Sequence, residues 1–295
     1  AASDVYKRQV WDAVFMAISV FNNAGFVILP EGLSPHVTDW WMLIPIILGT
    51  TVGAIGFPVI MDVAKNLRTP RRWRLHTKLT LSTYLILAFV GALALALTEW
   101  NNPATLGAID TPSKILNAML AGVNSRSSGL SALDVGAMQT QTHFVQDILM
   151  MIGGGSASTA GGVKVTTFAV LVLAVIAEAR GDRDIETFGR RIPTSAVRLA
   201  VAVSLLGLAL VAVSVVLLLS MTHYSLDIIL FETASAFATV GLSTGITPVL
   251  PVGAKYVLIF LMFAGRTGSM TVAAALALRE RSRVIRMPEE RPIIG

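Results

Sequence analysis

Three apolar stretches of this sequence approach or exceed the length that a helix needs to cross a lipid bilayer. They cover residues 79–97, 199–219 and 256–278. A membrane-spanning helix needs about 20 mainly apolar residues. The chain is 54% hydrophobic and only 14% charged, whereas an ordinary soluble domain is about 25% charged. The sequence therefore predicts an all-α integral membrane protein that crosses the membrane several times.

The basic residues gather at the ends of these apolar stretches. Segments 65–78, 178–198 and 279–295 hold six, five and five Lys and Arg residues, whereas the predicted outer loops hold Lys114 and Lys255. Cytoplasmic loops of membrane proteins carry an excess of Lys and Arg. We therefore expect the three basic segments, including the C-terminus, to be cytoplasmic and the protein to lie in the cell inner (plasma) membrane. The net charge of +5 does not predict nucleic-acid binding, because no basic domain is present.

Several function classes lack their required residues. The chain has no cysteine, so it has no disulfide framework and no thiolate metal site. Its histidines do not have the spacing of metal ligands; they are His36, His76, His143 and His223. No cluster of nucleophile and base suggests an enzyme. Residues 1–9 do not resemble a signal peptide, and we interpret them as a non-native or scar-like N-terminus.

An internal repeat centres on three glycines. A pattern of Phe, Ser, Phe and Gly occurs twice with identical spacing, at Phe15, Ser19, Phe21 and Gly25 and again at Phe231, Ser235, Phe237 and Gly241. Gly129 lies near the midpoint between the two copies and marks a more divergent third copy.

Each glycine follows an apolar segment of about a dozen residues, at 11–21, 114–123 and 227–237. These segments are too short to span a bilayer, and the loops on both sides are predicted to be outside. We therefore expect three re-entrant helices, each followed by a loop and a span. Backbone at membrane depth needs a water-filled cavity or protein around it. Ordinary helix turns with glycine caps are the alternative, but three copies favour a pore whose backbone carbonyls replace the water shell of an ion.

These motifs resemble the Trk/Ktr/HKT superfamily of potassium transporters, and the bacterial KtrB/TrkH type in particular. The resemblance rests on segments 21–26, 124–130 and 238–248. It implies a pseudo-fourfold, potassium-channel-like arrangement of span, re-entrant pore helix and loop, and span. On this interpretation about two and three-quarter repeats are present, and the chain is a fragment that lacks the first repeat and the opening span of the second.

The resemblance also implies which residues form the ion-selectivity filter. Backbone groups of nine residues are expected to hold potassium: Asn23, Ala24, Gly25, Ser127, Ser128, Gly129, Thr239, Val240 and Gly241. The third loop departs from the family pattern at Ser128 and Leu130. Arg126 matches a family arginine and is expected to brace its loop from behind, since a cation facing the pathway would repel potassium.

Residues 153–162 contain five glycines inside an apolar run. Each glycine inside a helix costs about 1 kcal/mol relative to alanine, so a break in the helix is predicted. A nucleotide-binding P-loop does not fit, because Lys164 follows Val163 rather than glycine. The resemblance implies an intramembrane gating loop below the filter, although a glycine-rich packing face is also consistent with the sequence.

The predicted gating residues are Gly153, Gly154, Gly155, Ser156, Ser158, Thr159, Gly161, Gly162, Lys164 and Arg266. Arg266 follows Gly265, which lies 24 residues after Gly241, the same interval that separates Gly153 from Gly129. A charge inside an apolar run should face the pathway or a polar partner. We expect it to contact carbonyls of the glycine loop, with a purely structural arginine as the alternative.

Other polar and glycine residues are given structural roles. Glu99, Asp110, Asp134 and Asp227 lie at predicted outer helix ends and are interpreted as solvated caps. Gly49, Gly53, Gly56 and Pro58 are expected to kink or thin the span that closes the second repeat.

The domains follow from these assignments. They are the N-terminus 1–9, the second repeat 10–64, a basic loop 65–78, the third repeat 79–177, a loop 178–198, the fourth repeat 199–278 and a tail 279–295. The resemblance implies potassium uptake without a cofactor, in a homodimer that binds a cytosolic nucleotide-binding regulatory subunit. Two alternatives stay open: a secondary transporter of a small solute with broken helices, and a non-conducting membrane scaffold subunit.

Overall fold

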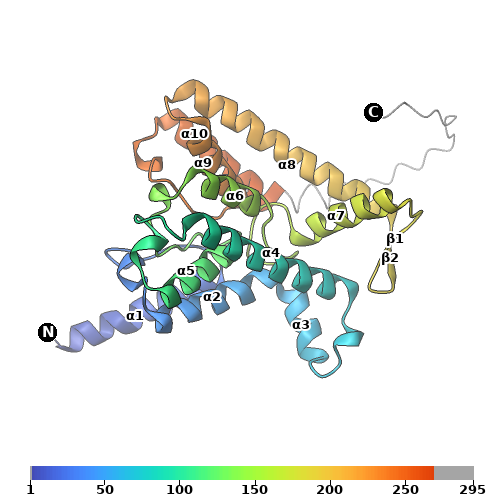
Figure 1. Ribbon diagram of the computed structural model, residues 1–295, viewed down its shortest axis with the longest axis horizontal. Coiled ribbons are helices and arrows are strands. Elements are labelled where there is room, and N and C mark those ends of the chain that lie inside the picture. The colour runs from blue at the N-terminus through green and yellow to red at the C-terminus, as the bar shows by residue number, and fades with distance from the viewer. Residues whose placement is uncertain (1, 269–295) are drawn as a thin grey trace.

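The computed structural model describes residues 2–268 and is mostly helical, which confirms the predicted fold class (Figure 1). The helices are α1 (Ala2–Phe21), α2 (Trp40–Ile55), α3 (Phe57–Lys65), α4 (Leu75–Glu99), α5 (Thr111–Asn124), α6 (Thr140–Met151), α7 (Val165–Arg180), α8 (Thr194–Met221), α9 (Leu226–Ala238) and α10 (Val252–Phe263). A π-helical turn, Ala264–Gly268, follows α10. The predicted tail 279–295 lies outside the described residues.

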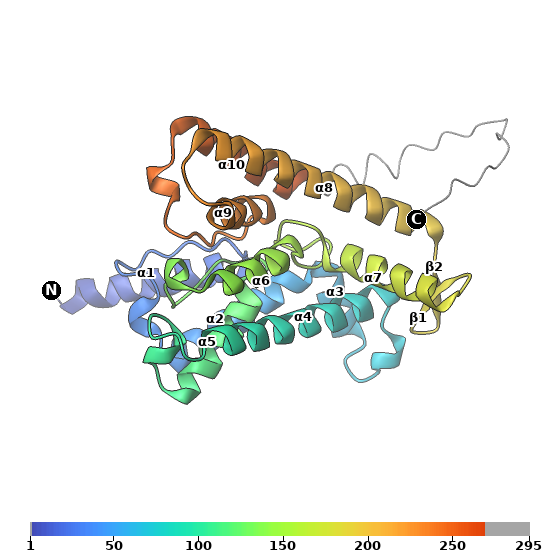
Figure 2. The same cartoon turned by 45° about the horizontal axis from the view of Figure 1, so that its top comes forward.

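The helices form layers around a shared apolar core. In Figure 2, α8 and α10 run along one side of the molecule, α4 and α5 lie on the opposite side, and α6 lies between them. One core cluster joins Ala118 of α5, Met150 of α6 and Phe231 of α9. Short helices of two sequence-distant units therefore contribute to the same core cluster.

Within residues 2–268, two helices are long and apolar enough to span a membrane, by length and composition: α4 with 25 residues and α8 with 28. They contain the predicted stretches 79–97 and 199–219. Their outer faces expose large apolar side chains such as Phe89, Leu205 and Val216, as expected for surfaces that contact lipid. The third predicted stretch, 256–278, is described only as far as Gly268.

The pair α2 and α3 passes the same test together, but its two helices differ in direction by 95°. Gly56 lies at the break with a φ of +92°, and Pro58 lies in the first turn of α3. A left-handed backbone angle favours glycine, and proline is tolerated at a helix start. The sequence predicted a kink here, and the structure shows a corner.

The short helices have the predicted character, with one difference. α5 and α9 have 14 and 13 residues, about 20 Å at 1.5 Å per residue. α1 is longer, because residues 2–9 continue the helix rather than forming a separate stretch. No proline or glycine occurs between Ala2 and Phe21 to stop it.

Both described basic segments are more ordered than predicted. The carboxylate of Asp62 in α3 accepts hydrogen bonds from Thr77 Oγ1 at 2.6 Å and Arg74 N at 2.9 Å, which joins α3 to the start of α4. These bonds, first that from Thr77, lower the pKa of Asp62. Segment 178–198 contains a two-stranded hairpin, β1 (Ile185–Thr187) and β2 (Arg190–Ile192), which the all-α prediction did not include.

Candidate functional site

The three repeat glycines come together at the centre of the molecule. A Cβ atom on Gly25 would collide with the carbonyl oxygen of Ser128, and one on Gly129 would collide with that of Val240. The φ angles of Gly25, Gly129 and Gly241 are +73°, +63° and +98°. Side chains are disfavoured in this conformation. Because they lack a Cβ atom, Gly25 and Gly129 can each lie close to a carbonyl of the next loop. Glycine also allows the positive φ angle at all three positions.

Two of the three loops have the same backbone construction. Ala24 N donates to Ser19 O, and Val240 N donates to Ser235 O, both at 2.9 Å. The residue before each of these donors, Asn23 or Thr239, has a φ near +50°. These matching bonds show that the sequence repeat is also a repeat of local structure.

The third loop is built differently. Ser127, Ser128 and Gly129 all donate their backbone N–H to Asn124 O, at 3.3, 3.2 and 3.0 Å. Its sequence departures at Ser128 and Leu130 thus accompany a different turn.

A polar side chain at the end of each short helix holds the backbone near the glycine. Ser19 Oγ donates to Phe26 O and Asn124 Nδ2 donates to Leu130 O, both at 2.8 Å. In the remaining loop, Ser235 Oγ accepts from Gly241 N at 3.2 Å. This explains why serine belongs to the repeated pattern: its hydroxyl holds the loop backbone.

The predicted glycine loop lies between α6 and α7, and its backbone is hydrogen-bonded on two sides. Gly155 N donates to Ala54 O of α2 at 2.8 Å, and Gly153 N donates to Val163 O at 2.8 Å. A Cβ atom on Gly161 would collide with Thr239 Oγ1. The loop is thus packed tightly between the corner of α2 and α3 and the end of α9.

Side chains join this loop to the glycine-centred loops. Asn23 Nδ2 donates to Thr159 Oγ1 at 2.7 Å, and Asn23 Oδ1 accepts from Ser127 Oγ at 2.9 Å. Thr159 Oγ1 donates to Gly53 O at 3.2 Å. Asn23 and Ser127 are buried. One network therefore connects the loops of Gly25 and Gly129, the glycine loop and α2.

Two cations donate to carbonyl oxygens of the same loop. Arg266 Nη1 donates to Thr159 O, and Lys164 Nζ donates to Ala160 O. Ser158 Oγ accepts from Ala160 N at 3.2 Å, within the loop. The loop's carbonyls are partly satisfied by these charges, as proposed from the sequence for Arg266.

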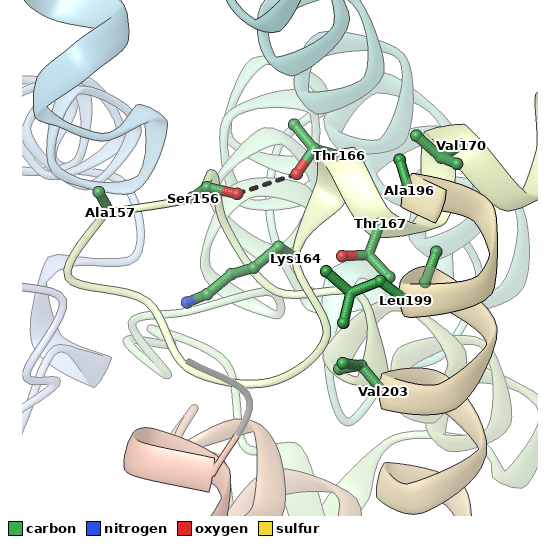
Figure 3. Close-up of a pocket in the computed structure, with 10 residues that line it drawn as sticks. Ser156, Ala157, Lys164, Thr166, Thr167, Val170, Ala196, Leu199 and Val203 are labelled. Carbon is green, nitrogen blue, oxygen red and sulfur yellow. Dashed lines mark hydrogen bonds between the residues drawn. The ribbon is translucent and has the colours of Figure 1, made fainter. Parts of the chain in front are cut away.

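A cavity of about 440 Å³ lies beside this loop, between α7 and α8 (Figure 3). Ser156, Lys164 and Thr166 form its polar side, and Ser156 Oγ lies 2.9 Å from Thr166 Oγ1. Leu199 and Val203 of α8 line the apolar side.

Comparison with known proteins decides the family. A family model described as TrkH, cation transport protein, matches residues 2–285. The chain belongs to the TrkH family. It is 39% identical over 290 residues to the Ktr system potassium uptake protein B of Bacillus subtilis, covering 98% of this chain and 65% of that protein. It is 34% identical to the protein of the same name from Vibrio alginolyticus, covering 98% and 64%.

A solved structure supports the fold of this TrkH-family chain. The potassium transporter TrkH from Vibrio parahaemolyticus superimposes with a TM-score of 0.71 at 18% identity, covering 91% of this chain and 58% of that one. The chain thus spans about two thirds or less of the length of these relatives.

The structure brings the predicted filter residues of the TrkH-family chain together, but not in equivalent surroundings. Asn23, Ser127 and Ser128 are buried, as is Val240. Asn23 and Ser127 bond to each other through their side chains. The Asn23 and Ser127 side chains therefore hold neighbouring loops together.

Arg126 lies behind its loop, against α4. Its Nη1 donates to Tyr84 O at 2.7 Å, and its guanidinium carbon lies 3.8 Å from the centre of the Tyr84 ring. Its side chain is fully buried. The arginine thus joins the loop of Gly129 to α4.

The interpretation of Glu99 as a solvated cap was wrong. Glu99 is fully buried. Its carboxylate accepts hydrogen bonds from Thr105 Oγ1 at 2.6 Å and Gln139 N at 2.8 Å, with further bonds from Asn102 and Thr142. Its position at a helix end suggested an exposed side chain, whereas partners up to 43 residues away in the sequence enclose it. Asp110 and Asp134 do cap short helices, by accepting from Ser113 N and Gly136 N.

Sequence reasoning also missed Glu232. It is buried in α9, beside the loop of Gly241. The available signal was an acid in the middle of a short apolar segment, followed about ten residues later by Ser243 and Thr244.

Proposed function

We propose that this chain forms part of a potassium-uptake pathway across the cytoplasmic membrane. Dehydrated potassium ions pass backbone carbonyls of residues 23–25, 127–129 and 239–241. The main support is that the loops of three glycines with positive φ angles come together. A Cβ atom on Gly25 or Gly129 would collide with a carbonyl oxygen of the next loop. Such carbonyls replace the hydration shell of an ion.

The choice of potassium rests on relatives. Two of them are named potassium uptake proteins, and a 33% identical one from Enterococcus hirae is named a potassium/sodium uptake protein. Carbonyl groups by themselves are compatible with either ion. This proposal makes the chain a transporter component rather than an enzyme, with potassium as its transported ion and no cofactor.

The glycine loop 153–162 acts as the gate in this proposal. It is fixed to the filter through Asn23 and to Arg266 through the Thr159 carbonyl. A cation near the pathway raises the barrier for another cation. Movement of the loop together with Arg266 would therefore alter both the steric and the electrostatic barrier.

The orientation of the chain in the membrane follows from the distribution of its Lys and Arg residues. Basic segments 65–78 and 178–198 face the cytoplasm in this proposal, in accordance with the positive-inside bias. Lys78 and Phe188 bring these segments together, with the ammonium 5.8 Å from the ring centre. We assign this face to the cytosolic nucleotide-binding regulatory subunit, and we expect the pore protein to form a homodimer.

Rubidium uptake by the native gene product, in a bacterial strain that lacks potassium uptake, tests the function. We expect saturable uptake that potassium inhibits more strongly than sodium. Gly241→Ala should reduce this preference, because Gly241 has a φ of +98° with open space around a Cβ atom. Since the new Cβ atom would meet no neighbouring atom, the substitution would act only by straining the filter backbone.

Gly32→Ala is the matched control. Gly32 also has a positive φ, of +63°, and open space around a Cβ atom, but it lies outside the proposed filter. Absence of uptake by wild-type protein that reaches the membrane would overturn the function. Equal ion preference in the two variants would overturn the filter assignment at Gly241.

A further inference from the structure

Glu232 is a buried carboxylate that binds the outer part of a filter loop. It is 4% exposed. Its Oε1 accepts from Ser243 Oγ at 2.7 Å, Thr244 N at 2.8 Å and Thr244 Oγ1 at 3.0 Å, and its Oε2 accepts from Thr247 Oγ1 at 2.8 Å. All four donors belong to the segment that leaves Gly241.

The other two pore helices have apolar residues at the corresponding position. Glu232 precedes its filter glycine by nine residues; the same interval before Gly25 and Gly129 gives Met16 and Leu120. Both are buried. Packing of a pore helix at this position therefore does not require an acid. The acid in α9 instead has hydroxyl partners in the following segment, from Ser243, Thr244 and Thr247.

The hydrogen-bond pattern fits an ionised carboxylate. An ionised carboxylate only accepts, through two oxygens with several lone pairs, and here three hydroxyls and one backbone N–H are donors. None of these four donors carries a charge. Hydrogen bonds from neutral donors stabilise a buried charge without cancelling it, so this group contributes negative potential beside the loop.

The bound segment is also held from its other side. A Cβ atom on Gly136, in the outer loop of the preceding unit, would lie 2.9 Å from Thr244 O. Ser235 Oγ binds Gly241 N at the inner end of the segment. The backbone between Gly241 and Thr247 is thus fixed by α9 at two points and by the neighbouring unit at a third.

We propose that Glu232 is a positioning and specificity-determining residue at the outer filter entrance, where it holds residues 241–247 and supplies a fixed negative charge that favours entry of a monovalent cation. This inference rests on the proposed function. Charge and position act together: the hydrogen bonds orient the backbone near Gly241, and the charge lowers the energy of an ion arriving there. A purely structural carboxylate would supply only the first effect.

Glu232→Gln separates these effects, because glutamine has nearly the same shape and still accepts hydrogen bonds, but has no charge. Glu99→Gln is the matched control, since Glu99 is also buried with several hydrogen bonds but binds segments around 102–105 and 139–142. The measurements are rubidium uptake against concentration, inhibition by sodium, and the amount of native gene product in the membrane.

We expect Glu232→Gln to raise the half-saturating rubidium concentration about tenfold and to change inhibition by sodium, with the maximal rate per protein within about twofold of wild type. Glu99→Gln should leave half-saturation unchanged. Equal half-saturation in wild type and Glu232→Gln would overturn the inference while leaving potassium uptake intact. Wild-type protein without uptake would instead overturn the proposed function itself.

Thr247→Val provides a second test if Glu232→Gln does not reach the membrane. It removes the Thr247 donor to Oε2 but retains the charge and the three donors to Oε1. We expect a smaller rise in half-saturation at an unchanged maximal rate. Half-saturation equal to wild type in this variant would then count against the inference.

Discussion

Asn23 Nδ2 donates a hydrogen bond of 2.7 Å to Thr159 Oγ1, which joins the loop of Gly25 to the glycine loop between α6 and α7. The same carboxamide accepts from Ser127 Oγ of the neighbouring filter loop at 2.9 Å. A displacement of Thr159 therefore removes a bond from Asn23, which also joins the loop of Gly25 to the loop of Gly129. The proposed gate and the proposed filter share one buried polar network.

Thr159→Val should destabilise the position of the glycine loop. Valine keeps the shape of threonine but cannot bind Asn23 or Gly53 O. Two hydrogen bonds of about 1 kcal/mol each correspond to roughly a thirtyfold change in the equilibrium between loop positions. We expect higher unstimulated rubidium uptake. Thr222→Val, which loses only a local bond to Leu218 O at the end of α8, should behave like wild type; equal uptake in all three proteins would contradict the role of Thr159.

Gly56→Ala should disturb the docking of the glycine loop on the corner between α2 and α3. The new Cβ atom would lie 2.6 Å from Ser156 O, in addition to the strain of a φ of +92°. Gly181→Ala is the control for strain alone, because Gly181 has a φ of +74° and open space. Thermal unfolding of the purified native gene product should show a larger decrease in Tm for Gly56→Ala. Equal decreases would show that the contact has no effect.

Arg126→Met should destabilise the protein more than Tyr84→Leu. Loss of the arginine removes a charged donor from the buried Tyr84 O and the contact with the ring, at 2.7 and 3.8 Å, with an expected loss of about 2–4 kcal/mol. Tyr84→Leu keeps the backbone carbonyl and loses the ring. Denaturant unfolding in detergent measures both variants. A greater loss in Tyr84→Leu would show that ring packing dominates over the charged hydrogen bond.

The sequence predicted features that depend on local patterns. The spacing of Ser19 and Gly25, repeated at Ser235 and Gly241, predicted two loops of similar construction, because the hydroxyl that holds each loop comes from the preceding turn of helix. The five glycines of 153–162 likewise predicted the break that the structure shows, since each one weakens a helix independently of tertiary contacts.

Features that depend on distant partners were not predicted. The burial of Glu99 depends on Gln139 and Thr142, about 40 residues further along the chain. The hairpin β1–β2 was missed for a different, local reason. Its strands have only three residues each and are joined by Phe188 and Gly189, with φ angles of +49° and +71°. Strands this short leave no alternation that a sequence pattern can detect. The network through Asn23 required three loops to be placed in space.

Asp62 gives a prediction about pH. In the folded protein, hydrogen bonds from Thr77 and Arg74 hold its pKa below the ordinary value of 3.8. A lowered folded-state pKa means that the stabilisation is fully present above the unfolded-state value, and that it is lost as pH falls through the folded-state value. Asp62→Asn should therefore increase hydrogen exchange at Arg74 N at pH 7, and the difference from wild type should shrink only in acid below about pH 4. Asp12→Asn, in α1, should leave exchange at Arg74 unchanged. An Asp62 effect that vanished well above pH 4 would contradict the lowered pKa, because the carboxylate would then be losing its charge too early.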